Sequence, residues 1–223
     1  MIRFAALFAF ALLPGVGAPL VHADLVVQQH VDGGGQQGDM TVKIKGTKSR
    51  ADLPQPVSVI TDSATGDTIL LRHNRKTFTR IPASQVKALT EQLLHAQGDA
   101  PPPKLQSTGK KEAVNGHQAE IYDWNIGAMK MKFWIANDFP NVETIKQQLD
   151  ALQHGGLSDV VASMMPKSSD MPGIRVKAEI EMPGHKVTYT ISSIKEEAVD
   201  PGVFEIPKDY TEAALPLPGA EPD

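Results

Sequence analysis

Residue types that perform chemistry are scattered along the chain rather than gathered into a catalytic motif. Seven histidines occur in 223 residues, and none stands in an H-E-x-x-H or H-x-H arrangement that would place two imidazoles on one metal. No G-x-S-x-G segment is present, so no serine is predicted on a sharp strand-to-helix turn. We therefore expect a chain that is not an enzyme; a hydrolase built from distant carboxylates is the least supported alternative.

Binding motifs for phosphate, metals and cofactors are also missing from the sequence. Gly33-Gly34-Gly35 is followed by no Lys-Ser/Thr pair and does not suit a phosphate loop. The segment 62–67 lacks the ligand spacing of a calcium-binding EF-hand. The chain has no cysteine, which excludes disulfides, thiolate metal sites and thiol nucleophiles. We expect neither a metal site nor a cofactor.

Flexible apolar side chains are the more suggestive feature. Methionine adapts to varied apolar partners and is frequent on surfaces that accept them. One set of such residues shares a predicted strand face, and another shares the apolar stripe of a predicted helix. The candidate ligand-binding residues are Met129, Met131, Phe133, Val161, Met164 and Met165. The alternative is that these side chains simply fill the core between helix and sheet.

The first 23 residues have the organisation of a secretory signal peptide. Arg3 precedes the apolar run Phe4–Leu13, and Val21-His22-Ala23 suits a cleavage site. The apolar run is well short of the ~20 residues that span a bilayer as a helix. We therefore predict cleavage before Asp24, no transmembrane segment, and export; the periplasm is the expected location and secretion the alternative.

The charge of the chain argues against a nucleic-acid partner. The chain has 22 Lys and Arg and 26 Asp and Glu residues, which gives a net charge of −4. Binding to the phosphates of a nucleic acid needs clustered positive charge. A modest basic cluster lies on a predicted hairpin and comprises Arg72, Arg75, Lys76 and Arg80. We expect this hairpin to be solvated, with contact to an anionic headgroup as the alternative.

Much of the chain alternates between apolar and polar residues with a period of two. In one clear example Ile174, Val176 and Ala178 alternate with Arg175 and Lys177. Such alternation indicates antiparallel strands with one face buried, and it predicts Arg175 on the wet face.

Turn and helix signals complete the expected architecture. Asn115-Gly116 suits a type I′ hairpin turn, in which both residues need positive φ. Apolar residues follow helical spacing in the ranges 84–94, 141–152 and 157–165. We predict an α+β fold, a curved antiparallel sheet of roughly eight to eleven strands with about three helices on its concave face. Residues 24–210 form one domain, and 211–223 are a flexible, proline-containing tail.

Several longer motifs recur together in a known family. They are Thr108–His117, Ile121-Tyr122, Phe133–Pro140 and Val199–Tyr210. Together they resemble an uncharacterised family of exported bacterial proteins, the domain of unknown function four-four-one-two. That family is similar to the LolA/LolB lipoprotein-carrier and RseB superfamily.

The resemblance implies an unclosed barrel whose concave face, covered by helices, can hold acyl chains, and it implies no catalytic residues. We find no counterpart of the arginine with which carriers hold their lid loop shut, so Arg50, Arg72 and Arg80 receive no such role. The combined interpretation is a non-catalytic binding module for a lipid or the acyl chain of a lipoprotein. An envelope sensor or protein-interaction domain with a filled core is the alternative. The sequence predicts no oligomeric state.

Overall fold

A computed structural model of the protein describes residues 24–88, 91, 103–152 and 165–214. Its strands are β1 (Leu25–Gly33), β2 (Gln36–Lys45), β3 (Lys48–Asp52), β4 (Val57–Asp62), β5 (Asp67–Arg72), β6 (Thr77–Ile81), β7 (Gln106–Val114), β8 (His117–Ile126), β9 (Met129–Ala136), β10 (Ile174–Met182), β11 (His185–Glu196) and β12 (Thr211–Glu212). The described helices are one at residues 83–88, α2 (Val142–Leu152), and the 3-10 turns η1 (Ser168–Asp170) and η2 (Pro201–Phe204).

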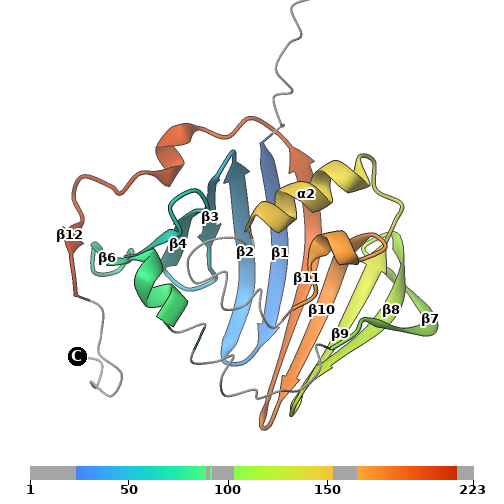
Figure 1. Ribbon diagram of the computed structural model, residues 1–223. Coiled ribbons are helices and arrows are strands. Elements are labelled where there is room, and N and C mark those ends of the chain that lie inside the picture. Colours follow the sequence, from blue (N-terminus) through green and yellow to red (C-terminus); the bar gives the residue numbers. More distant parts are fainter. Residues whose placement is uncertain (1–23, 89–90, 92–102, 153–164, 215–223) are drawn as a thin grey trace, which may run out of the picture.

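All twelve strands belong to one curved sheet (Figure 1). Their order is β12-β6-β5-β4-β3-β2-β1-β11-β10-β9-β8-β7, so β12 and β7 are the two edges and the sheet does not close. Neighbouring strands are antiparallel, except that β12 pairs in parallel with β6. The unclosed antiparallel sheet was predicted. The short β12 lies within 211–223 and takes the strand number beyond the predicted eleven.

Two α-helices occur in the described part of the chain, whereas the sequence predicts about three. The predicted third helix falls on residues 157–164, which lie outside the described residues, and on Met165, which is in a bend. The predicted signal peptide, residues 1–23, also lies outside the described residues. Helix α2 crosses the upper part of one face of the sheet, in front of β1 and β11 (Figure 1).

The two faces of the sheet bury separate cores because successive strand side chains point to opposite sides. On the face toward α2, Leu25 and Val27 pack with Ile145 of the helix. On the opposite face, Val26 packs with Phe204 of η2 in the segment that leads to β12. The sheet therefore carries a helix on one side and the C-terminal segment on the other.

The turn between β7 and β8 has the predicted conformation. Asn115 has φ of 48° and Gly116 has φ of 89°, which are the positive values that a type I′ turn requires. An added Cβ at Gly116 would meet no atom within 4 Å. The cost of a side chain there is therefore backbone strain alone.

Replacing Gly116 by Val is expected to lower the free energy of unfolding by ~1–3 kcal/mol, because a β-branched residue is strained at positive φ. Gly116→Asn is the matched control, since asparagine tolerates this conformation. Chemical denaturation measures both variants. Equal stability of the Val and Asn variants would show that the turn is not tight.

Candidate functional site

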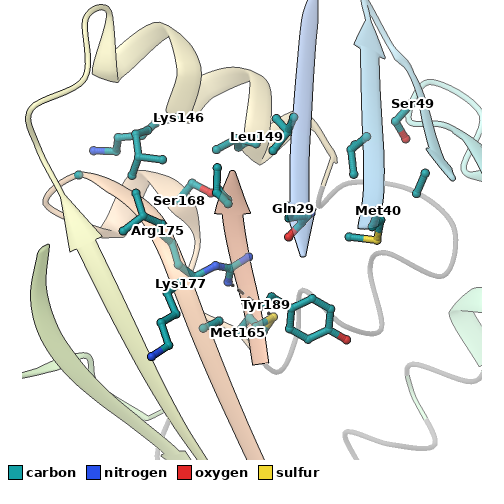
Figure 2. A pocket seen from close by; sticks show the side chains of 18 of the residues that line it. Gln29, Met40, Ser49, Lys146, Leu149, Met165, Ser168, Arg175, Lys177 and Tyr189 are labelled. Atoms are coloured by element: carbon teal, nitrogen blue, oxygen red, sulfur yellow. Dashed lines mark hydrogen bonds between the residues drawn. The ribbon is translucent and has the colours of Figure 1, made fainter. Parts of the chain in front are cut away.

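A cavity of about 430 Å³ lies between the sheet and the α2–η1 region. Its walls come from β1, β2, β3, β4, β10 and β11, with Leu149 of α2 and Ser168 of η1 closing one side (Figure 2). The volume is within the ~300–1,000 Å³ typical of small-molecule sites. Widely separated parts of the sequence therefore meet around one apolar space.

The floor of the cavity is a row of small and branched apolar side chains at one level of the sheet. Strand register places them opposite one another across four neighbouring strands. This valine row consists of Val27, Val42, Ala51 and Val59. Because none is large, the row leaves space between the sheet and α2. The four side chains share one face of the sheet because successive side chains of a strand point to opposite faces.

Helix α2 covers this floor with one face. Ile145 is 3% exposed, and Leu149, four residues later and so on the same helix face, lines the cavity. Asp150 holds η1 against the helix end, since its carboxylate accepts hydrogen bonds from the backbone N–H groups of Ser168 (2.6 Å) and Ser169 (2.9 Å). Helix α2 and η1, which together cover the cavity, are therefore linked to each other by hydrogen bonds.

Three cationic side chains line the cavity, and two of them have carboxylate partners. Lys146 lies 3.2 Å from Glu143, and Lys177 lies 3.3 Å from Glu179. The ammonium of Lys177 also lies 4.0 Å from the ring centroid of Trp134. Arg175 is different: within the described part of the chain it forms no ion pair. The described lining contains no Asp or Glu, so Arg175 is the lining cation whose charge the described residues leave without a carboxylate.

Arg175 enters the cavity because β10 is irregular. Its pairing with β9 shifts register between Arg175 and Lys177, and such a bulge re-aims a side chain. The guanidinium lies 5.4 Å from the ring centroid of Phe133 and donates a weak 3.9 Å hydrogen bond to Sδ of Met165. The sequence predicts Arg175 on the wet face, whereas the structure has it partly buried in the cavity wall, because regular alternation cannot reveal a bulge.

Burial affects the ionisation of both polar groups at this end of the cavity. It lowers the pKa of Arg175, and the neighbouring Tyr189 opposes that change. Burial also raises the pKa of the Tyr189 hydroxyl, while the Arg175 cation opposes the rise. Arginine has so high an ordinary pKa that Arg175 remains a cation at neutral pH.

The candidate ligand-binding residues of the sequence fall into three groups. Met131 and Phe133 are 2% and 0% exposed and form a packed cluster with Met129 at their side. Met165 packs on that cluster and also lines the cavity. Val161 and Met164 lie outside the described residues. The valine row and Tyr189 were not predicted as site residues. Their period-two patterns indicate which face of a strand is buried, but not where a cavity lies on that face.

A second polar cluster lies on the opposite face of the sheet. The hydroxyl of Ser58 lies 2.6 Å from His73 Nε2 and 2.6 Å from Oδ1 of Asp52, and His73 Nδ1 lies 2.7 Å from the Tyr210 hydroxyl. Arg50 donates to Asp52 and to the carbonyl oxygen of Val203. The cluster ties the C-terminal segment to β3 and β4.

The direction of these hydrogen bonds shows whether Ser58 could act as a nucleophile or only helps to attach the C-terminal segment. Ionised Asp52 can only accept, so it takes the single proton of Ser58. His73 must then donate from Nε2 to Ser58, and a neutral imidazole accepts at Nδ1 from the Tyr210 hydroxyl. An imidazole that donates to a serine cannot remove its proton. The arrangement therefore suits attachment of the C-terminal segment rather than activation of Ser58.

Stability is expected to fall in acid through Asp52. Burial alone would raise the pKa of Asp52, but hydrogen bonds from Ser58 and Arg50 outweigh it, and the net pKa is lowered from 3.8. A carboxyl with a lowered folded-state pKa stabilises the fold above its unfolded value, and this contribution is lost as pH falls through the folded value. Thermal melts between pH 7 and pH 2 measure the loss. Asp52→Asn should be less stable at pH 7 and show a shallower decline below pH 4; an unchanged pH profile would contradict the anchor.

The fold and the cavity together define an α+β protein with an unclosed antiparallel sheet and a covered apolar pocket. The chain belongs to the DUF4412 family, a domain of unknown function, which it matches over residues 27–210. The family recognised from the sequence motifs is thereby confirmed. No curated protein matches the chain.

Several solved structures are similar to the chain at low sequence identity. An uncharacterized conserved protein from Thermus thermophilus matches with a TM-score of 0.53 and 8% identity over 87% of this chain and 92% of that chain. MucB in complex with MucA(peri) matches with a TM-score of 0.36 and 8% identity over 85% of this chain and 55% of that chain. PNGF-II matches with a TM-score of 0.43 and 11% identity over 86% of this chain. The chain spans 31% of the length of PNGF-II.

The described helices are too short or too polar to cross a membrane. Likewise, the described residues contain no group of three His, Cys, Asp or Glu side chains placed to hold a metal ion.

Proposed function

We propose that this protein is an exported, non-catalytic binding module that holds a hydrophobic ligand, a lipid or the acyl chain of a lipoprotein, between α2 and the sheet. The observation that carries the proposal is the apolar cavity of about 430 Å³, floored by the valine row of β1, β2, β3 and β4. The signal peptide predicted at residues 1–23 supports export, with the periplasm as the expected location.

The driving force would be burial of the acyl chain. Removing apolar surface from water contributes ~25 cal/mol per Å². The part of the wall formed by valine, isoleucine and leucine side chains offers water no hydrogen-bond partner. Both the ligand and this part of the wall therefore lose unfavourable contact with water when an acyl chain enters.

The rival function is protein binding through an exposed sheet edge, and the two edges do not favour it. Strand β7 is mostly exposed, carries Lys110, Lys111 and Glu112, and is irregular in register against β8 between Ser107 and Lys111. Charges and irregular pairing are features that prevent addition of another strand. The other edge, β12, is two residues long.

Native mass spectrometry of the protein, expressed with residues 1–23 in a bacterial host and purified without detergent from the exported fraction, tests the proposal. The expected result is a one-to-one complex that releases a lipid on collisional activation. As a second measurement, the delipidated protein should take up N-phenyl-1-naphthylamine, a neutral apolar probe, with saturation at one equivalent. Absence of both the bound lipid and saturable probe uptake would contradict the proposed function and leave the protein-interaction alternative.

A further inference from the structure

Arg175 has a placement that apolar binding alone does not explain. Arg175 is partly buried, and a cation taken even partly out of water is costly unless an anion pairs with it. The other cations of the cavity wall obey this rule, through Glu143 and Glu179. Arg175 has in the described residues only the thioether of Met165 as a hydrogen-bond acceptor, and a thioether is a weak one.

The side chain is nevertheless held in a defined position. The ring of Phe133, itself 0% exposed, lies beneath the guanidinium at 5.4 Å, a separation at which a cation is attracted to an aromatic face. Figure 2 shows the guanidinium directed toward the ring of Tyr189 and toward Met165. Arg175 is thus oriented into the cavity before any ligand arrives.

The charge of the cavity indicates which ligand group would suit Arg175. The described lining has no acidic residue. The carboxylates of Glu143 and Glu179 are already paired with Lys146 and Lys177, so the positive charge offered to an anion at this wall comes from Arg175. Guanidinium groups bind carboxylate and phosphate through two parallel hydrogen bonds, with a geometry that lysine cannot reproduce. An apolar wall, together with a guanidinium that has no carboxylate partner in the described part of the chain, matches a molecule with an apolar chain and an anionic head.

We propose that the ligand is a single-chain amphiphile with an anionic carboxylate or phosphate head, and that Arg175 binds this head while the valine row holds the chain. The inference rests on the proposed function and specifies its ligand class. The head would replace the weak contact with Met165, and the Tyr189 hydroxyl, close enough for Arg175 to influence its pKa, would lie beside it.

The test compares three ligands with the same twelve-carbon chain: dodecanoate, dodecyl phosphate and 1-dodecanol. Each competes at pH 7.5 with N-phenyl-1-naphthylamine for the full chain. We expect one or both anions to bind roughly 10- to 100-fold more tightly than the alcohol, because a hydrogen bond to a charged group contributes about that factor. Which anion binds more tightly distinguishes a fatty acid from a phosphate-headed lipid.

Arg175→Met is the decisive variant, since methionine keeps an apolar stem over Phe133 and removes the charge. It should abolish the preference for anions and leave the affinity for 1-dodecanol within about twofold. It should also keep or raise the thermal midpoint, because it removes a partly buried cation that has no carboxylate partner among the described residues. Arg175→Lys should retain part of the preference for anions, since lysine keeps the charge but cannot form the two parallel hydrogen bonds of a guanidinium.

The outcomes separate the two proposals. Equal binding of anions and alcohol by the wild type would overturn the role of Arg175 while leaving an apolar ligand in place. An equal loss of affinity for all three ligands in Arg175→Met would show that Arg175 only shapes the wall, and would also overturn it. No binding of any ligand or of the neutral probe would instead contradict the proposed function.

Discussion

Replacing Ala51 by Trp is expected to abolish uptake of an apolar ligand, with a fall in affinity of at least about 100-fold. Ala51 is the smallest member of the valine row and lies at its centre, between Val42 and Val59. An indole at this position would occupy the space that an acyl chain needs. Since the cavity is hollow in the wild type, the fold should accept the larger side chain with little loss of stability.

The matched control for this variant is Lys48→Trp. Lys48 is exposed and belongs to the same strand, three residues before Ala51 and therefore on the opposite face of β3. It should leave probe affinity unchanged. Val59→Phe is a milder second variant, should Trp at position 51 lower the thermal midpoint. If both cavity variants fold and still bind the probe as the wild type does, the ligand does not lie in this cavity.

Replacing Phe133 by Ala is expected to cost ~3–5 kcal/mol of stability, the usual loss when a fully buried aromatic ring is truncated. Phe133 is 0% exposed, packs in the cluster with Met131 and Ala178, and supports the Arg175 guanidinium. Its removal would leave both a void and an unsupported cation. Denaturation in urea measures the change.

Met165→Ala is the control for Phe133→Ala. Met165 is partly buried and lines the cavity, so its truncation should cost less stability and weaken probe binding instead. If the two variants lost the same stability, Met165 would be a core residue rather than a wall of the site. A small loss for Phe133→Ala would contradict the packed cluster beneath Arg175.

Local patterns in the sequence were sufficient to predict the type of fold. Period-two alternation identified β10 and β11, and Asn115-Gly116 identified a tight turn, because both signals depend on neighbouring residues alone. The unclosed sheet and the family followed from longer motifs. The predicted number of helices, about three, differs from the two that the described residues contain. The third predicted segment lies mostly outside the described residues.

The site was less accessible from sequence for two physical reasons. The valine row joins residues of four strands, and only the strand register shows that Val27 and Val59 lie at the same level. The position of Arg175 depends on a bulge in β10, which alternation does not reveal. Likewise, Met131 and Met165 look equivalent in sequence, and only packing shows that the first belongs to the core and the second to the cavity wall.

The most direct test of the account is a crystal structure of the full chain grown with saturating dodecanoate. The account predicts continuous density for the alkyl chain between α2 and the row Val27, Val42, Ala51 and Val59, with the carboxylate within hydrogen-bond distance of Arg175. An empty cavity at saturating ligand, or density only on the outer surface of the sheet, would contradict it.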